Sequence, residues 1–231
     1  MSAGGPTPDR RALQALSRTV LSRGSRLKPE VARIELAAGP AILKDCAPLP
    51  GWSRWLARWL LRRELRALAR LEGLEGFPPL LARPDRDAAL IGLLPGRPLE
   101  GEAFARDARR LAGILRRRVS DLHARRVYHL DLRQRQNLLL DEEGGTLNVV
   151  DFGAALAPGR FAALLFGPLL GWVDRQAALK YLARFAPGEM SREEAESYLR
   201  GQRWRRLWVF SPHRNRGAAA AVRKRLQDLS G

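Results

Sequence analysis

Two short stretches near the middle of the chain constrain its fold more than any other part of the sequence. Residues 128–141 read YHLDLRQRQNLLLD, and residues 149–153 read VVDFG. The mostly apolar stretches 138–141 and 147–150 are typical of two short strands around a turn rich in Glu and Gly. One carboxylate and one amide therefore lie on the loop before this hairpin, and a second carboxylate, that of Asp151, lies directly after it.

These side chains suit the transfer of a phosphoryl group from a magnesium-bound nucleotide. Such a transfer needs one group that orients the attacking hydroxyl and oxygen ligands that hold the metal ion. Asp131 is the candidate for the first task, and Asn137 and Asp151 are the candidate Mg²⁺ ligands. Taken alone, Asp131 would equally suit a residue that caps a turn.

The two stretches resemble the catalytic loop and the Asp-Phe-Gly motif of protein kinases. The resemblance implies that Asp131 orients the hydroxyl, that Asp151 binds the Mg²⁺ bridging the phosphates of ATP, and that Arg133 stabilises the transferring group. A solvated arginine is the alternative for Arg133. The family places its Asn five positions after the Asp, where this chain has Gln136, whereas Asn137 stands at the sixth. Asn137 is the expected second metal ligand, and Gln136 is its substitute.

A second pair of residues fits the same resemblance. Residues 31–36 alternate as a half-buried strand does, and residues 41–45 follow a Gly-Pro turn, so the two predict a hairpin. Lys44 lies in the second strand in the stretch AILK, which is similar to the kinase motif whose Lys contacts nucleotide phosphates. Glu64, in the predicted helix 52–71, is its implied partner. A lysine on an edge strand with a solvated head is the alternative.

The phosphate-covering loop departs from the family pattern. Kinases have a glycine-rich loop before the strand lysine. Here residues 22–26 read SRGSR, with one glycine. Gly24 and Ser25 are the residues expected to approach the phosphates. This departure leaves open a pseudokinase or binding scaffold that does not transfer phosphate.

The chain also lacks features of larger protein kinases. Leu130 stands where many of them have Arg, no Ala-Pro-Glu follows Gly153, and the remaining sequence is short for a full C-terminal lobe. The chain therefore looks like small bacterial kinases, namely the lipopolysaccharide-core kinases and the minimal atypical serine/threonine kinases related to the RIO group. The resemblance covers residues 31–154, and it does not specify the acceptor.

The order of elements predicts an α+β fold with two unequal lobes, and the resemblance implies that this fold is protein-kinase-like. Residues 1–15 are expected to be a flexible start that turns helical near Ala12. Residues 16–96 are expected to be a small β-rich N-lobe that binds nucleotide, and 97–231 a mostly helical C-lobe. A further strand is expected at 88–94. The helices expected after it are 104–126, 172–187, 191–209 and 217–229.

Composition favours a globular, cytoplasmic protein. The chain has 231 residues, of which 45% are hydrophobic, and one cysteine, Cys46, which excludes an internal disulfide. The N-terminus lacks the apolar core of a secretory signal. The longest apolar run, 161–173, contains Gly167, Pro168 and Gly171 and is too short to span a bilayer.

The net charge of +17 favours anionic partners. Residues 200–216 interleave basic and aromatic side chains, which suits contact with an anionic membrane, contact with nucleic acid, or an amphipathic packing helix. The expected function is a minimal serine/threonine protein kinase that uses ATP and Mg²⁺. A lipopolysaccharide core sugar kinase at the inner membrane surface is the closest alternative, and a nucleic-acid binder is less favoured.

Overall fold

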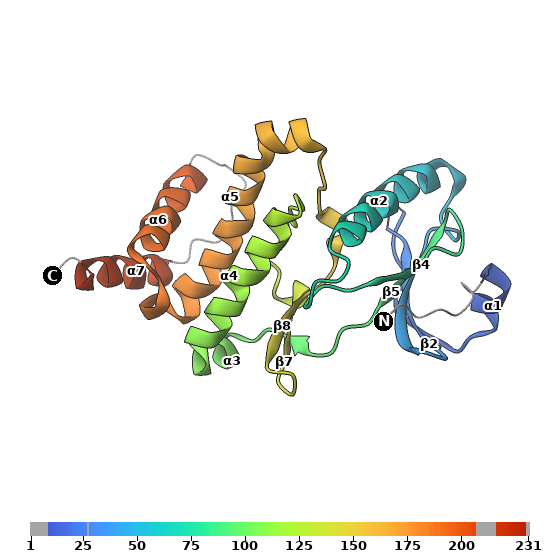
Figure 1. The fold of residues 1–231 in the computed structure, drawn as a ribbon, viewed down its shortest axis with the longest axis horizontal. Helices are drawn as coiled ribbons and strands as arrows, with labels where there is room; N and C mark the ends of the chain where they lie inside the picture. The colour runs from blue at the N-terminus through green and yellow to red at the C-terminus, as the bar shows by residue number, and fades with distance from the viewer. Residues whose placement is uncertain (1–8, 27, 207–215, 230–231) are drawn as a thin grey trace. The chain divides into compact units, whose positions relative to one another are not determined.

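The chain forms an α+β structure that divides into two compact units (Figure 1). The computed structural model describes residues 9–26, 28–206 and 216–229. Unit 1 contains the described residues up to Leu94 together with Val150–Ala157, and unit 2 contains the remainder. The first boundary lies two residues before the expected division after residue 96. Residues 150–157, with Asp151, return to the first unit rather than staying in the second.

Unit 1 is built on a five-stranded antiparallel sheet with the order β1-β2-β3-β5-β4. The predicted hairpin is confirmed, because β2 and β3 pair from Glu30↔Asp45 to Leu36↔Gly39, and Gly39 closes the turn with a φ of 117°. Two outer strands were not predicted: every residue of β1 is exposed, and β4 has three residues. The strands are β1 (Arg18–Ser22), β2 (Glu30–Leu36), β3 (Gly39–Asp45), β4 (Leu80–Ala82) and β5 (Ala88–Gly92).

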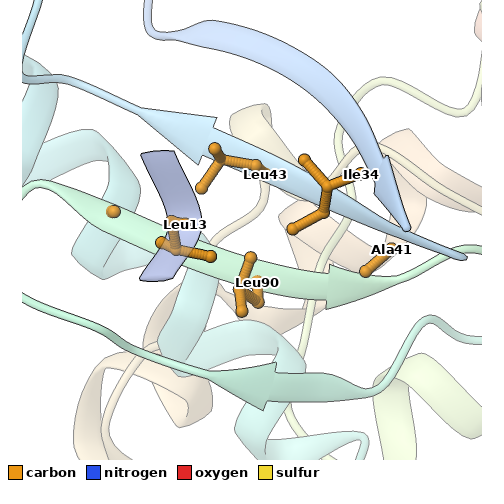
Figure 2. Close-up of a cluster of buried hydrophobic side chains, with 6 residues drawn as sticks. Leu13, Ile34, Ala41, Leu43 and Leu90 are labelled. Atoms are coloured by element: carbon orange, nitrogen blue, oxygen red, sulfur yellow. The ribbon is translucent and has the colours of Figure 1, made fainter. Parts of the chain in front are cut away.

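One face of this sheet carries an apolar cluster covered by α1 (Arg10–Ala15). Leu13 of α1 packs with Ala41 and Leu43 of β3 and with Leu90 of β5 (Figure 2). Side chains alternate along a strand, so Lys44 points to the opposite face from Leu43. The Asp9 carboxylate caps α1 by accepting from the Ala12 N–H at 2.8 Å. The start of the chain was expected to turn helical near Ala12, and residues 10–15 form a helix that the buried Leu13 fixes to the sheet.

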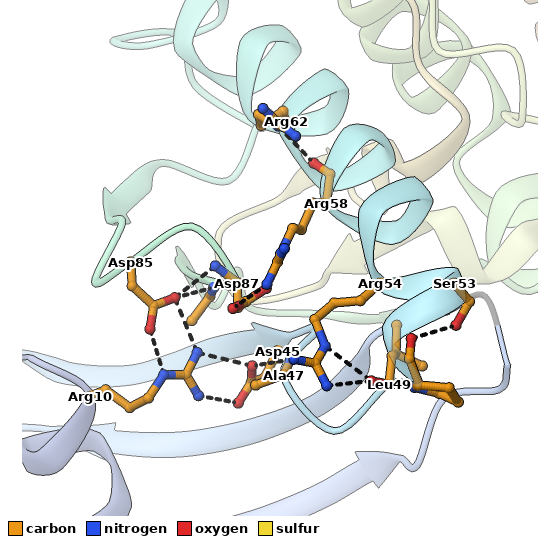
Figure 3. Close-up of polar contacts among 12 residues, drawn as sticks. Arg10, Asp45, Ala47, Leu49, Ser53, Arg54, Arg58, Arg62, Asp85 and Asp87 are labelled. Carbon is orange, nitrogen blue, oxygen red and sulfur yellow. Dashed lines mark hydrogen bonds and ion pairs between the residues drawn. The ribbon is translucent and has the colours of Figure 1, made fainter.

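Ion pairs hold the ends of β3 and β5 to the helices (Figure 3). The Arg10 guanidinium donates to Asp45, with Nη1 at 2.9 Å from Oδ2, and also to Asp85. Arg58 of α2 (Gly51–Arg70) donates to Asp87, with Nη2 at 3.0 Å from Oδ2. Helix α1 is thereby joined to the end of β3, and both α1 and α2 are joined to the residues just before β5.

The three tryptophans of α2 recur at helical spacing, but they do not lie on its buried face. Trp52, Trp55 and Trp59 are exposed, whereas the side chains at Ala57 and Leu61 lie in the core. The buried set recurs every three or four residues, as expected for one helical face. Its members are Ser53, Ala57, Leu61, Glu64, Leu65, Ala67 and Leu68.

Unit 2 is mostly helical and has a small sheet of order β6-β7-β8. The predicted helix 104–126 is two helices, which are separated at Asp107 by a non-helical backbone. The predicted helix at 172 begins twelve residues earlier, at Arg160. The elements are β6 (Arg97–Pro98), β7 (Leu138–Asp141), β8 (Thr146–Val149), α3 (Gly101–Arg106), α4 (Ala108–Ala124), α5 (Arg160–Phe185), α6 (Arg192–Arg206) and α7 (Arg216–Asp228).

Gly167 and Gly171 lie inside α5 at points of close packing, so they do not interrupt the helix. A Cβ on Gly167 would lie 2.5 Å from Tyr128 Oη, and a Cβ on Gly171 would lie 3.3 Å from His123 Cε1. Among the helices of the described residues, none combines the length and apolarity needed to cross a bilayer. Of the basic and aromatic stretch 200–216, residues 207–215 lie outside the described part of the chain.

Candidate active site

Unit 1 brings together three charged residues that are distant in the sequence. Lys44 Nζ on β3 lies 2.7 Å from Glu64 Oε1 on α2 and 3.3 Å from Asp151 Oδ1. The side chains of Lys44 and Glu64 are 12% and 6% exposed. Burial acts to lower the pKa of Lys44, but the charges of Glu64 and Asp151 outweigh it and raise that pKa above its ordinary value. The ammonium therefore stays charged at neutral pH.

Asp151 is held in an uncommon backbone conformation. Its φ of 61° and ψ of 76° lie in the left-handed region, which is uncommon for residues other than Gly, although Asn and Asp adopt it more often than most. Its side chain is 58% exposed, and Oδ1 accepts from the Gly153 N–H at 3.4 Å. Arg63 of α2 donates to the Gly153 carbonyl at 2.7 Å, and the buried Phe152 ring meets Phe77 edge to face at 6.2 Å. These contacts present the Asp151 carboxylate on a fixed turn.

The β1–β2 turn carries Gly24 and Ser25, the residues expected near the phosphates. Gly24 has a φ of 72°, and a Cβ there would lie 2.3 Å from the Lys28 carbonyl oxygen, so the turn requires glycine. The strand register pairs Ser22 with Val31 and Val31 with Lys44. The turn therefore leaves the sheet at the end where Lys44 lies.

In unit 2, Asp131 and Asn137 lie together. Asn137 is buried and its Nδ2 donates to the Asp131 carbonyl oxygen at 3.0 Å and to Asp131 Oδ2 at 3.2 Å. This orientation makes Oδ1 the amide oxygen that a cation would use. Gln136, the alternative, is exposed and donates to Gln134 Oε1 at 2.7 Å. A 3₁₀ turn, η1 (Arg135–Asn137), brings Asn137 back to Asp131, six positions before it in the chain.

Asp174 of α5 anchors the backbone before Asp131. No role for this residue was predicted from the sequence. Its fully buried carboxylate accepts the N–H groups of His129 at 2.9 Å and Leu130 at 2.7 Å, and it lies 3.2 Å from His123 Nε2. Leu130 needs this support because its φ is 64°. One signal was present in the sequence, since Asp174 is the only acidic residue in 152–188.

Two further residues of α5 anchor the backbone after Asp131. Tyr181 Oη donates to the carbonyls of Leu132 at 3.1 Å and Arg133 at 3.2 Å, and Lys180 Nζ donates to the Arg133 carbonyl at 3.1 Å. Burial raises the pKa of Tyr181 to about 12, so its hydroxyl remains a donor at neutral pH. The main chain of Arg133, the candidate for phosphoryl stabilisation, is thus fixed, and its side chain is half-buried.

The oxygen donors suit Mg²⁺ better than a metal that needs many protein ligands. Within the ranges that the structure describes, no group of three or more His, Cys, Asp or Glu side chains is placed to hold a metal ion. Mg²⁺ is commonly held by one or two carboxylates, with phosphate and water completing its shell. Asp151 offers an exposed carboxylate in unit 1, and Asn137 offers an amide oxygen in unit 2.

Comparison with known proteins adds no family to this description. No family model matches the chain, and no curated protein matches it. The assignment of function therefore depends on the geometry of the two sets of residues.

Proposed function

We propose that this protein transfers the γ-phosphoryl group of ATP to a hydroxyl acceptor with the help of Mg²⁺. The contact of Lys44 with both Glu64 and Asp151 is the observation that carries the proposal. A buried ion pair is weak evidence for stability, because desolvation of its charges offsets their attraction. A lysine held charged beside an exposed carboxylate is better explained by a ligand that carries both phosphate and a divalent cation.

In this proposal the residues of unit 1 bind the nucleotide. Lys44 contacts the phosphates, Glu64 holds the lysine in place, and Asp151 would hold the Mg²⁺ that accompanies the nucleotide. The β1–β2 turn offers the backbone N–H groups of Gly24 and Ser25 to the phosphates. Mg²⁺ supplies charge neutralisation on the transferring group when it is bound.

The residues of unit 2 act on the acceptor. Asp131 orients the attacking hydroxyl and receives its proton, and Asn137 provides a second metal ligand. Arg133 stabilises the charge of the transferring group. The anchoring of this loop by α5 supports the proposal, since transfer requires reacting groups to be held in a fixed geometry.

A serine or threonine side chain of a protein is the acceptor that we favour. A lipopolysaccharide core sugar at the inner membrane surface is the second candidate. The exposed apolar residues at the start of α5 favour it, because they would suit an enzyme that works beside lipid.

Transfer of labelled γ-phosphate tests the proposal. The protein is incubated with labelled ATP, Mg²⁺ and either a panel of proteins or purified lipopolysaccharide core. Label is expected on one acceptor class with the wild type and with Asp228→Ala, a control on the exposed end of α7, and it is expected to be lost with Asp131→Ala. Nucleotide binding without transfer to any acceptor would favour a scaffold and contradict the proposal.

A further inference from the structure

The first half of α5 exposes an apolar surface larger than scattered surface leucines would make. Five of its large apolar side chains are between 56% and 86% exposed, and no charged residue occurs from 161 to 173. Contiguous exposed apolar surface of this kind marks a binding site for protein, lipid or another ligand. We call the five residues the α5 patch: Phe161, Leu164, Leu165, Phe166 and Leu169.

Packing within unit 2 fixes the direction of the α5 patch. Gly167 packs closely against Tyr128, which lies just after the end of α4. Gly171, one helical turn further along α5, packs against His123, which lies just before that end. The larger side chains of this part of α5 are therefore turned outward. Figure 1 shows the first turns of α5 extending past the end of α4.

The surroundings of the α5 patch are basic. Arg160 begins α5, Arg125 and Arg126 lie in the turn between His123 and Tyr128, and Arg175 follows Gly171 by one turn. All four arginines are exposed. The one carboxylate of residues 152–188, Asp174, is buried and accepts hydrogen bonds from the backbone. An anionic surface that met this region would therefore face arginines and no exposed carboxylate of α5.

We propose that the α5 patch docks onto a bilayer containing anionic phospholipid. The Phe and Leu side chains enter the boundary between headgroups and acyl chains, and the arginines contact headgroup phosphates. Docking of a second copy is disfavoured by charge, because a symmetric contact would bring the two sets of arginines together. The proposal places the protein on a membrane whether or not it transfers phosphate, and its tests use no nucleotide.

Sedimentation with vesicles tests the apolar part. The full chain is expected to bind vesicles of phosphatidylcholine with a minority of phosphatidylglycerol, and to bind phosphatidylcholine alone weakly. Leu164→Ser/Leu165→Ser is expected to lower the partition coefficient by at least about tenfold. The control Leu81→Ser/Leu229→Ser, which removes two exposed leucines elsewhere, should leave it unchanged. No binding by the wild type, or equal losses in both variants, would overturn the proposal.

The basic part is tested with a charge-matched pair of variants. Arg125→Gln/Arg160→Gln is expected to weaken binding to the anionic vesicles by about fivefold for each arginine, with no effect on neutral vesicles. Arg117→Gln/Arg223→Gln removes two exposed arginines from α4 and α7 and should have less effect. Equal effects of the two variants would show attraction by net charge alone and would contradict a defined docking face.

A fluorescent label reports insertion directly. Cys46 is the one cysteine of the chain, it is buried, and burial raises the pKa of its thiol to about 11, so a polarity-sensitive dye should react selectively with Leu165→Cys. The dye emission is expected to shift to the blue with anionic vesicles, and not with Leu81→Cys. Light scattering without vesicles should find a monomer. A dimer that Leu164→Ser/Leu165→Ser dissociates would assign the patch to a second copy and overturn the proposal.

Discussion

The two units place their candidate active-site residues by different means. In unit 1, charged side chains position one another, since Lys44 contacts both Glu64 and Asp151. In unit 2, helix α5 positions a loop by its backbone, through Asp174 and Tyr181. The first arrangement can be recognised from residue types at a given spacing. The second depends on a helix more than forty positions away in the chain, which no local pattern indicates.

This difference predicts distinct consequences for mutations in the two units. In unit 1, changes should affect nucleotide binding and should be strongly coupled between partners, because the partners form one charge network. In unit 2, changes at Asp131 should affect turnover alone. Substitutions in α5 should loosen the loop that α5 holds and should therefore lower the free energy of unfolding.

The largest effect is expected for Asp131→Asn. Asparagine keeps the shape of the side chain but cannot accept the proton of the hydroxyl, so turnover should fall by about 10³-fold. Binding of ATP with Mg²⁺ should stay near the wild-type value, since the residues proposed to contact the phosphates lie in unit 1. Labelled-phosphate transfer and calorimetric ATP titration measure the two quantities. Turnover at the wild-type level would exclude the proposed role of Asp131.

The next effect concerns the Lys44–Glu64 pair. Lys44→Met or Glu64→Leu leaves the other charge buried without its main partner, which should lower the free energy of unfolding by about 3 kcal/mol in each case. The double variant removes both charges and should cost much less than the sum. Urea unfolding of the four proteins completes the double-mutant cycle. Additive losses would show that the two side chains are not energetically coupled.

A smaller loss is expected when the backbone anchor of unit 2 is removed. Asp174→Ala leaves the N–H groups of His129 and Leu130 without their buried acceptor, which should cost about 2 kcal/mol of stability. Asp228→Ala, at the exposed end of α7, is the matched control and should cost almost nothing. The measurement is thermal or urea unfolding. If turnover changed and stability did not, Asp174 would have a direct part in the reaction.

The smallest expected effect is on the way the free energy of unfolding depends on pH under acidic conditions. The Arg58 guanidinium holds the pKa of Asp87 below its ordinary value, although burial opposes this. Because the folded-state pKa is lower, the pair stabilises the fold above the ordinary carboxyl pKa, and this contribution is lost as pH falls through the lower value. Asp87→Asn should therefore flatten the loss of stability between about pH 5 and about pH 2. An unchanged acid limb in urea unfolding would show that this pair does not contribute.

Several elements were predictable because one local pattern determined them. The β2–β3 hairpin followed from alternation and a Gly-Pro turn. The contact between Lys44 and Glu64 is the one that the resemblance to kinases implied. Others depended on tertiary contacts. Helix α5 begins twelve residues before its predicted start, and within this added part Gly167 and Gly171 pack closely on Tyr128 and His123.

The aromatic residues of α2 show the limit of periodicity most clearly. Trp52 and Trp55 recur at helical spacing, yet both are exposed, and the smaller Ala57 and Leu61 fill the core. The spacing of large side chains identifies a helix and leaves open which face is buried. That choice depends on the room available against the sheet, which the sequence of the helix does not contain.

Calorimetric titration of ATP with and without Mg²⁺ tests the central claim most directly. The wild type should bind ATP more tightly with Mg²⁺ than without it, and Asp131→Asn should behave in the same way. Asp151→Asn should remove the gain due to Mg²⁺, and Lys44→Met should weaken binding in both conditions. The claim would be contradicted by a wild type that does not bind ATP, or by a Mg²⁺ gain that Asp151→Asn leaves unchanged.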